Sequence, residues 1–143
     1  MQSDGVNADI ALREVDRPVP GPGQMLIRVK AAGLNRGEFI LGHGLHKAGT
    51  AKQIGMEAAG EIVACGDGVT SFKVGDRVMG RCTGAFAQFA LIPEREAMHI
   101  PTSLSWEQAA AIPLTSLVVF DMLVLLGKEE VLMRLEKGIA ARA

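Results

Sequence analysis

The fold is decided by the stretch Ile54-Gly55-Met56-Glu57-Ala58-Ala59-Gly60-Glu61-Ile62-Val63-Ala64-Cys65 and by the turn sequence Gly66-Asp67-Gly68 directly behind it. The small residues of this stretch predict a tightly packed strand that bends, with Glu61 pointing outward. Gly66 and Gly68 favour a turn, because glycine tolerates positive φ. The stretch therefore predicts a fold built from short strands.

Strand patterns continue on both sides of this stretch. Gln24–Ala32 alternates apolar and basic residues, as a strand with one solvated face does. An edge strand is expected at Ile10–Val15, ahead of an extended proline-rich loop at residues 17–23. Further extended segments are predicted at residues 74–80, 85–92 and 97–101. Six or seven short strands separated by turns predict a barrel or a sandwich.

The C-terminal part changes to helical patterns. Ser103 or Ser105 can cap a helix over Trp106–Ile112, because Glu107 and Gln108 then fall in its first turn. A short helix is also predicted earlier in the chain, near Arg36–Leu41, ahead of an irregular loop. The sequence is thus mainly β with helices.

Pro113 should break or kink the first C-terminal helix, and Leu114–Leu126 restarts a helix that is apolar nearly all round. Such a helix needs burial on more than one side, so we expect a homo-oligomer formed through the C-terminal helices. Residues 127–143 are predicted to form an amphipathic helical extension. We therefore divide the chain into a main domain, residues 1–126, and an extension, residues 127–143.

Composition excludes several classes of function. Fifteen basic and sixteen acidic residues give a net charge of −1 over 143 residues, without a block of like charge that would attract nucleic acid or an anionic membrane. The longest apolar run contains Pro113 and Asp121 and is too short to span a bilayer. The N-terminus shows no secretory signal, so Cys65 and Cys82 are expected to be free thiols in a cytoplasmic protein.

Several phrases, in this order, resemble the medium-chain dehydrogenase/reductase superfamily, and most of all its quinone oxidoreductase and enoyl reductase branch. They are Pro20-Gly21-Pro22-Gly23-Gln24-Met25-Leu26-Ile27-Arg28-Val29, Ala32-Gly33-Leu34-Asn35-Arg36, Gly55-Met56-Glu57-Ala58-Ala59-Gly60, Val74-Gly75-Asp76-Arg77-Val78, Gly84-Ala85-Phe86-Ala87-Gln88-Phe89 and Ala109-Ala110-Ala111-Ile112-Pro113-Leu114-Thr115. The resemblance implies a GroES-like, partly open β-barrel followed by C-terminal helices. In that fold Gly75 and Asp76 would make a turn, and Gly60 would let neighbouring backbones approach closely.

Two positions depart from the zinc-dependent alcohol dehydrogenases of this superfamily. Asn35 stands where those enzymes carry a cysteine ligand, and Met56 stands where they carry histidine in Gly-His-Glu. Catalytic zinc needs three N, S or O ligands, and a thioether is a poor one. With only two cysteines the chain also lacks the four-cysteine lobe that holds structural zinc. We therefore expect no metal site.

The resemblance implies a zinc-independent reductase that uses NADPH or NADH to reduce a quinone or an activated alkene. Asn35 would contact the nicotinamide ribose or the substrate, and Thr115 would lie beside the nicotinamide, so both are candidate catalytic and cofactor-binding residues. Many enoyl reductases carry a proton-donating tyrosine after the asparagine segment. Here Leu45 occupies that region and the chain has no tyrosine, which favours quinone chemistry, or none.

The phosphate-binding half of such an enzyme is not visible in the sequence. Neither Gly42-His43-Gly44 nor Gly66-Asp67-Gly68 continues into a G-x-G-x-x-G turn between a strand and a helix, so we expect no Rossmann domain. We therefore expect a chain truncated before its dinucleotide domain, inactive alone and without affinity for NADPH by itself. The alternatives are a stand-alone binding or oligomerisation module that uses its apolar helical edge and, with less support, a GroES-like co-chaperone.

Simpler interpretations apply to several candidate residues. His43 and His46 form an H-x-x-H pair without a third ligand nearby, and His99 is interpreted as a residue at the end of a strand. Arg81 could lower the pKa of Cys82, although an ordinary half-buried thiol fits better. Asn35 could close a turn, and Thr115 could bond to a backbone carbonyl. Glu57 is expected to serve structure through an ion pair, and Arg36 and Arg77 to be solvated or paired with Glu38 and Asp76.

Overall fold

The computed structural model describes residues 2–3, 8–38 and 53–140 of the chain. Its elements are β1 (Gln2–Ser3), β2 (Ala8–Asp9), β3 (Gln24–Ala32), the 3₁₀ helix η1 (Arg36–Glu38), β4 (Glu57–Cys65), β5 (Arg77–Arg81), β6 (Phe89–Pro93), η2 (Glu94–Glu96), β7 (Ala97–His99), α1 (Trp106–Ala110), α2 (Pro113–Leu126) and α3 (Lys128–Ala140). Contacts divide the chain into two compact units, Met1–Pro113 and Leu114–Ala143. This division lies at Pro113, ahead of the domain boundary that we set at Leu126.

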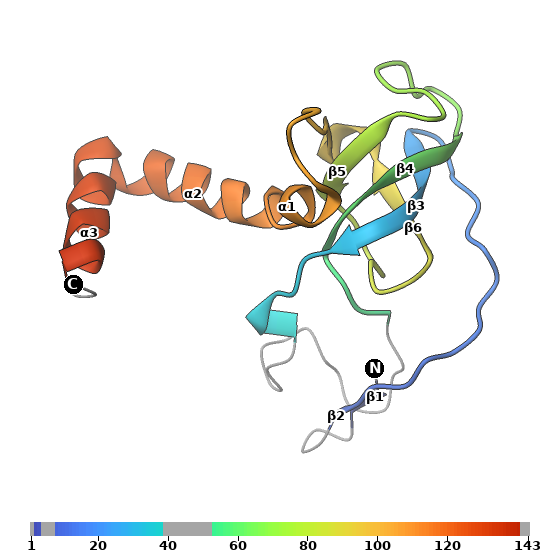
Figure 1. Cartoon of the computed structure of the whole chain (residues 1–143), viewed down its shortest axis with the longest axis horizontal. Coiled ribbons are helices and arrows are strands. Elements are labelled where there is room, and N and C mark those ends of the chain that lie inside the picture. The colour runs from blue at the N-terminus through green and yellow to red at the C-terminus, as the bar shows by residue number, and fades with distance from the viewer. Residues whose placement is uncertain (1, 4–7, 39–52, 141–143) are drawn as a thin grey trace. The chain divides into compact units, whose positions relative to one another are not determined.

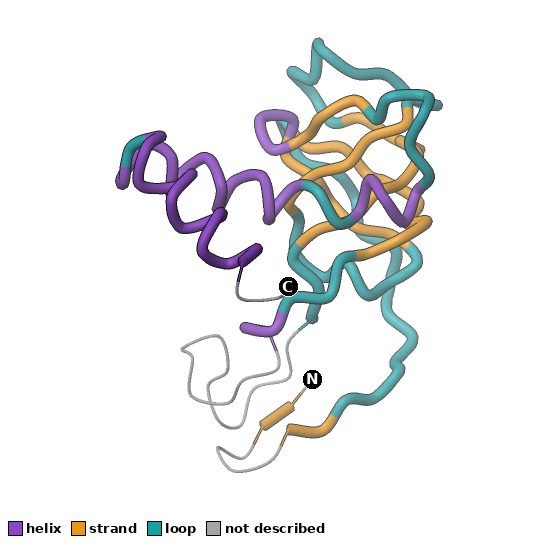
Figure 2. The backbone as a smooth tube through the Cα atoms, turned by 60° about the vertical axis from the view of Figure 1, so that its left-hand side comes forward, coloured by secondary structure: helices purple, strands orange, loops and turns teal. Residues whose placement is uncertain are grey.

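The first unit is a five-stranded sheet in the order β6-β3-β4-β5-β7. Every strand pairing in the described residues is antiparallel, including the separate β1–β2 pair. The sheet curls into a half-barrel (Figure 2). Two irregularities in the β3–β4 register, at Leu26/Ile27 and at Val29/Ala31, allow this bend. The predicted β-rich, GroES-like architecture with C-terminal helices is confirmed.

Alternating residues of the central strands build two cores, one on each face of the sheet. Ala58 and Val78 belong to the core inside the curl, while their neighbours Ala59 and Met79 belong to the other. Helix α1 packs against this second face beside β4 (Figure 1). Ala59 and Ala109 leave little space between helix and sheet, so the small side chains of the sequence permit this close packing.

Gly60 and Gly75 have the roles that the sequence predicted. A Cβ on Gly60 would collide with the carbonyl oxygen of Arg28 on β3, so glycine permits the close approach of the two strands. Gly75 has a φ of 94°, and Lys73 N donates to Asp76 Oδ2 at 3.0 Å, which closes the turn before β5. Both positions therefore need their residue types for the path of the backbone.

Helix α1 begins as its sequence indicates. Gln108 N donates to Ser105 Oγ at 3.2 Å, and Ser105 N donates to Gln108 Oε1 at 3.0 Å, a reciprocal capping box. Arg77 was expected to be solvated or paired with Asp76, and this expectation is wrong. Its guanidinium carbon lies 4.4 Å from the centre of the Trp106 ring, and Nη2 donates to Leu104 O at 2.9 Å. Arg77 thus holds the start of α1 on the sheet.

The edge strand expected at Ile10–Val15 does not form. These residues lie in an extended segment outside any strand, and Leu12 is fully exposed. The segment is anchored instead by Arg17, whose guanidinium carbon lies 4.2 Å from the centre of the Phe89 ring. An apolar alternation predicts a strand only where a sheet edge is available to pair with it.

The second unit consists of α2 and α3. Most apolar side chains of α2 are exposed, and they surround the helix as predicted. Helix α3 is amphipathic, and Arg134 and Glu130 form an ion pair at 2.7 Å along it. In the described residues no helix is both long and apolar enough to cross a membrane.

Candidate active site

Two buried carboxylates lie near Asn35. Glu57, the first residue of β4, and Glu38, in η1, are each 3% exposed. Asn35 Nδ2 donates to Glu57 Oε1 at 3.0 Å, and Asn35 N donates to Glu38 Oε2 at 3.3 Å. Asn35 itself is half-buried. The residue that the sequence named as the main candidate is therefore held at both its side chain and its backbone.

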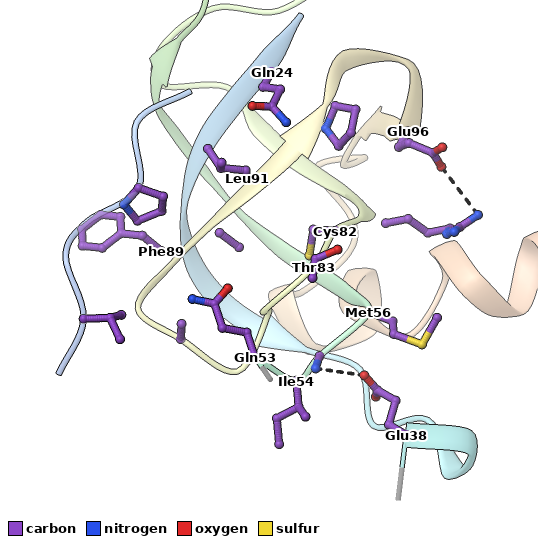
Figure 3. A pocket seen from close by; sticks show the side chains of 17 residues that line it. Gln24, Glu38, Gln53, Ile54, Met56, Cys82, Thr83, Phe89, Leu91 and Glu96 are labelled. Carbon is purple, nitrogen blue, oxygen red and sulfur yellow. Dashed lines mark hydrogen bonds and ion pairs between the residues drawn. The ribbon is translucent and has the colours of Figure 1, made fainter. Parts of the chain in front are cut away.

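Glu38 joins this group to the segment before β4. Gly55 N donates to Glu38 Oε1 at 2.9 Å, the bond drawn as a dashed line beside Glu38 in Figure 3. We expected Arg36 to be solvated or paired with Glu38; Arg36 is exposed, and Glu38 is buried. The two oxygens of Glu38 thus link Asn35 to Gly55, two residues that are distant in the sequence. The sequence alone did not predict this link.

Glu57 was expected to serve structure through an ion pair, and this role stays a prediction. Its side chain accepts a hydrogen bond from the Asn35 amide. Gly33 N also donates to the backbone oxygen of Glu57 at 3.2 Å. A Cβ on Gly33 would collide with the Glu57 carboxylate. Glycine at this position therefore makes room for the buried acid.

A cleft of about 560 Å³ opens beside this group. Glu38 lines it, together with apolar side chains that include Ile54, Phe89 and Leu91 (Figure 3). Asn35 is not among its lining residues and is linked to it through Glu38. The cleft is lined by residues of β3, β5 and β6, the segment before β4 and part of the extended segment before β3. Its size and lining suit a small, mostly apolar ligand.

Cys82 also lines the cleft. Burial raises the pKa of its thiol to about 12, and the nearby charges of Glu57 and Glu38 add to the rise. The proposed lowering by Arg81 is therefore wrong, whereas the half-buried thiol is confirmed. At neutral pH Cys82 is a protonated, weakly reactive group.

Thr115 lies in the first turn of α2 and is exposed. It belongs to the second compact unit, whereas Asn35 belongs to the first. The role of Thr115 therefore stays a prediction.

The remaining candidates fall into two groups. His99 ends β7, as expected, and its ring contacts Phe72 at 4.5 Å between centroids.

Among the described residues no three His, Cys, Asp or Glu side chains are placed to hold a metal ion. The pair His43 and His46, and Leu45 between them, lie outside the described residues.

Sequence reasoning did not assign Glu38, Met56 and Thr83 to a site. All three line the cleft, but no motif or spacing in the neighbouring sequence marks any of them as a site residue. The only signal was the spacing of Gly55-Met56-Glu57, which placed an acid next to a substituted ligand position.

Comparisons with known proteins agree with this fold. The model of the alcohol dehydrogenase GroES-like domain matches residues 21–102. A quinone oxidoreductase of Pseudomonas aeruginosa is 38% identical over 108 residues, which cover 73% of this chain and 33% of the relative. This chain thus spans about a third of that relative's length.

Two solved structures share the fold. The Escherichia coli quinone oxidoreductase complexed with NADPH is 32% identical with a TM-score of 0.69, over 78% of this chain and 35% of that one. The CurK enoyl reductase is 27% identical with a TM-score of 0.67, over 74% of this chain and 35% of that one. The chain is thus similar both to quinone oxidoreductases and to an enoyl reductase.

Proposed function

Because the chain belongs to the alcohol dehydrogenase GroES-like domain family of the medium-chain dehydrogenases and reductases, we propose that it is the substrate side of a zinc-independent, NAD(P)H-dependent oxidoreductase. Its substrate is a quinone or an activated alkene, and the absence of tyrosine from the sequence favours the quinone. The observation that carries the proposal is the hydrogen bond between half-buried Asn35 and buried Glu57 beside an apolar cleft.

The residues present fit one end of the cofactor. Asn35 offers a half-buried carboxamide, which suits the polar groups around the nicotinamide. In the described residues no glycine-rich turn joins a strand to a helix, so nothing there suits the pyrophosphate. When bound, NAD(P)H supplies the hydride, and Asn35 orients the group that it contacts. We extend the same role to Thr115.

The cleft itself suits quinone chemistry. Ile54, Phe89 and Leu91 provide apolar surface for a flat ring and exclude water from it. Cys82 would add to a quinone if it were a thiolate, but its raised pKa of about 12 keeps it protonated. The site therefore tolerates an electrophilic substrate beside a thiol.

Hydride transfer also needs a surface for the rest of the dinucleotide. The strand pairings of the described residues are antiparallel throughout and contain no parallel βαβ unit. We propose that a separate dinucleotide-binding domain completes the site and that these 143 residues are inactive alone. The two free cysteines support a cytoplasmic location.

The test compares the chain with a fusion in which residues 1–126 replace the matching third of the Pseudomonas aeruginosa quinone oxidoreductase. The chain alone should bind NADPH no tighter than about 100 μM, or about −5.5 kcal/mol, in a fluorescence titration, and should not reduce benzoquinone. The fusion should do both. A fusion that folds and binds NADPH but reduces neither a quinone nor an enoyl thioester would refute the proposed function.

Exposed residues on α2 favour a second candidate, self-association. Val118, Val124 and Leu125 are 51%, 66% and 81% exposed, and α3 has only one apolar face with which to cover them. Exposed apolar surface of this kind marks interfaces. We therefore propose that α2 and α3 form a homo-oligomer contact, which is compatible with either function.

A further inference from the structure

The contact between Asn35 and Glu57 has a defined polarity. Asn35 turns its Nδ2 group toward Glu57 Oε1, to which it donates a hydrogen bond at 3.0 Å. The carboxamide oxygen then faces away from Glu57. None of the described residues donates a hydrogen bond to Asn35 Oδ1. As far as residues 2–3, 8–38 and 53–140 are concerned, the outward atom of this side chain is an acceptor with unused capacity.

The partners on both sides of Asn35 make this orientation rigid. Glu57 is 3% exposed and packs against Gly33, where a Cβ would collide with its carboxylate. The backbone of Asn35 is fixed separately, because Asn35 N donates to Glu38 Oε2. With the backbone and the Nδ2 group both held, a flip of the carboxamide would break the hydrogen bond to Glu57.

We propose that Glu57 is a positioning residue that fixes the Asn35 carboxamide with its oxygen toward the ligand. This position then selects a group that donates a hydrogen bond, such as a hydroxyl or an amide N–H. A quinone carbonyl offers only acceptor atoms, so Asn35 selects a donor group of the cofactor or of a hydroxylated substrate instead. The proposal rests on the proposed function, which supplies the ligand.

The first test uses the full chain without ligand. Asn7 and Asn35 are the only asparagines, so asparagine-selective ¹⁵N labelling gives two side-chain amide signals, and Asn35→Ala identifies one of them. Exchange of the Asn35 amide protons with solvent should be at least tenfold faster in Glu57→Met, which keeps the side-chain length but removes the acceptor. Glu57→Gln should give an intermediate rate, because a neutral acceptor is weaker.

The matched control is Glu61→Met, which removes an exposed carboxylate from the same strand. It should leave the Asn35 exchange rate unchanged within twofold. Fluorescence of Trp106, the only tryptophan, reports whether each variant is folded. An unchanged Asn35 rate in folded Glu57→Met or Glu57→Gln would overturn the proposal.

A second test exchanges the partners and keeps the hydrogen bond. Asn35→Asp alone sets two carboxylates against each other, so it should lower the melting temperature by about 5 °C or more. Adding Glu57→Gln supplies a new donor and should restore more than half of the loss. If the double variant is no more stable than Asn35→Asp, the pair is not a directed hydrogen bond.

Kinetics of the fusion separate this proposal from the proposed function. Glu57→Gln should raise the KM for NADPH at least fivefold with a smaller effect on kcat, because the variant disturbs the Asn35 carboxamide that positions the bound cofactor. If the fusion is inactive while the exchange results hold, the proposed function fails and the positioning stands. If the fusion is active but insensitive to Glu57→Gln, the positioning fails and the function stands.

Discussion

The two compact units of the chain treat apolar side chains in opposite ways. In the sheet unit, residues such as Leu26 and Ile62 are buried, with exposed fractions of 2% and 0%. In the helical unit, Val124 and Leu125 of α2 are mostly exposed. Both units are rich in aliphatic residues, so composition does not separate them. The difference shows that the sheet unit buries its own apolar side chains. Helix α2 is as apolar as a core helix, but most of its apolar side chains are exposed.

The largest expected effect comes from one substitution made in both units. Leu26→Ala removes a side chain that is 2% exposed and should cost about 2–5 kcal/mol of unfolding free energy. Leu125→Ala removes one that is 81% exposed and should cost about 0.5 kcal/mol or less. Urea denaturation followed by circular dichroism measures both. Equal losses of unfolding free energy in the two variants would contradict the claim that only the sheet unit buries its apolar side chains.

A glycine substitution sharpens the comparison. Gly60→Ala drives a Cβ into the Arg28 carbonyl and should destabilise the sheet unit by about 1–3 kcal/mol. Gly127→Ala, between α2 and α3, meets no atom, although its φ of 78° is unfavourable for alanine. Trp106 fluorescence during urea denaturation reports on the sheet unit. A Gly127→Ala variant that lowers the Trp106 midpoint as much as Gly60→Ala would show that the units are not independent.

Self-association should depend on the helical unit alone. Light scattering after size exclusion should show a dimer or a larger species for the full chain. Replacing Val118 and Leu125 by glutamate should weaken association at least tenfold, because charges cannot be buried without partners. Leu12→Glu, at a fully exposed position of the sheet unit, is the control and should have no effect. A monomeric wild-type chain would refute the oligomer.

The smallest effect concerns the two cysteines. Cys65 is exposed, while Cys82 is partly buried with a pKa raised to about 12. Iodoacetamide at pH 8 should therefore modify Cys65 at least tenfold faster, although burial also raises the pKa of Cys65. Mass spectrometry of time points measures this. Faster labelling of Cys82 would show that its thiol is not enclosed.

The raised pKa of Cys82 also has a consequence for stability. The folded state holds this proton more tightly than the unfolded state, whose thiol titrates near 9.0. Its contribution is therefore present below pH 9 and is lost as the pH rises toward about 12. Cys82→Ala should flatten the fall in melting temperature over that range. An identical fall in the variant would contradict the assignment.

Local patterns predicted the elements whose causes are local. Alternation predicted β3, and Ser105 with Gln108 predicted the start of α1, because the residues involved lie within a few positions of one another. The strand expected at Ile10–Val15 was wrong, since pairing depends on a distant edge that the local pattern does not contain.

The site shows the same limit. The family resemblance indicated Asn35, but its hydrogen bond to Glu57 spans 22 positions and could not be predicted from spacing. Glu38 was considered only as a possible partner of Arg36. Its burial follows from the return of the chain at Gly55, which only the fold reveals.

The most direct test of the central claim is the benzoquinone reductase activity of the fusion with and without Asn35→Ala. If the sheet unit carries the substrate side of a hydride-transfer site, the variant should lose at least tenfold in kcat/KM, about 1.4 kcal/mol, while Trp106 fluorescence shows the same fold. A folded Asn35→Ala fusion within twofold of the unchanged fusion would contradict the account.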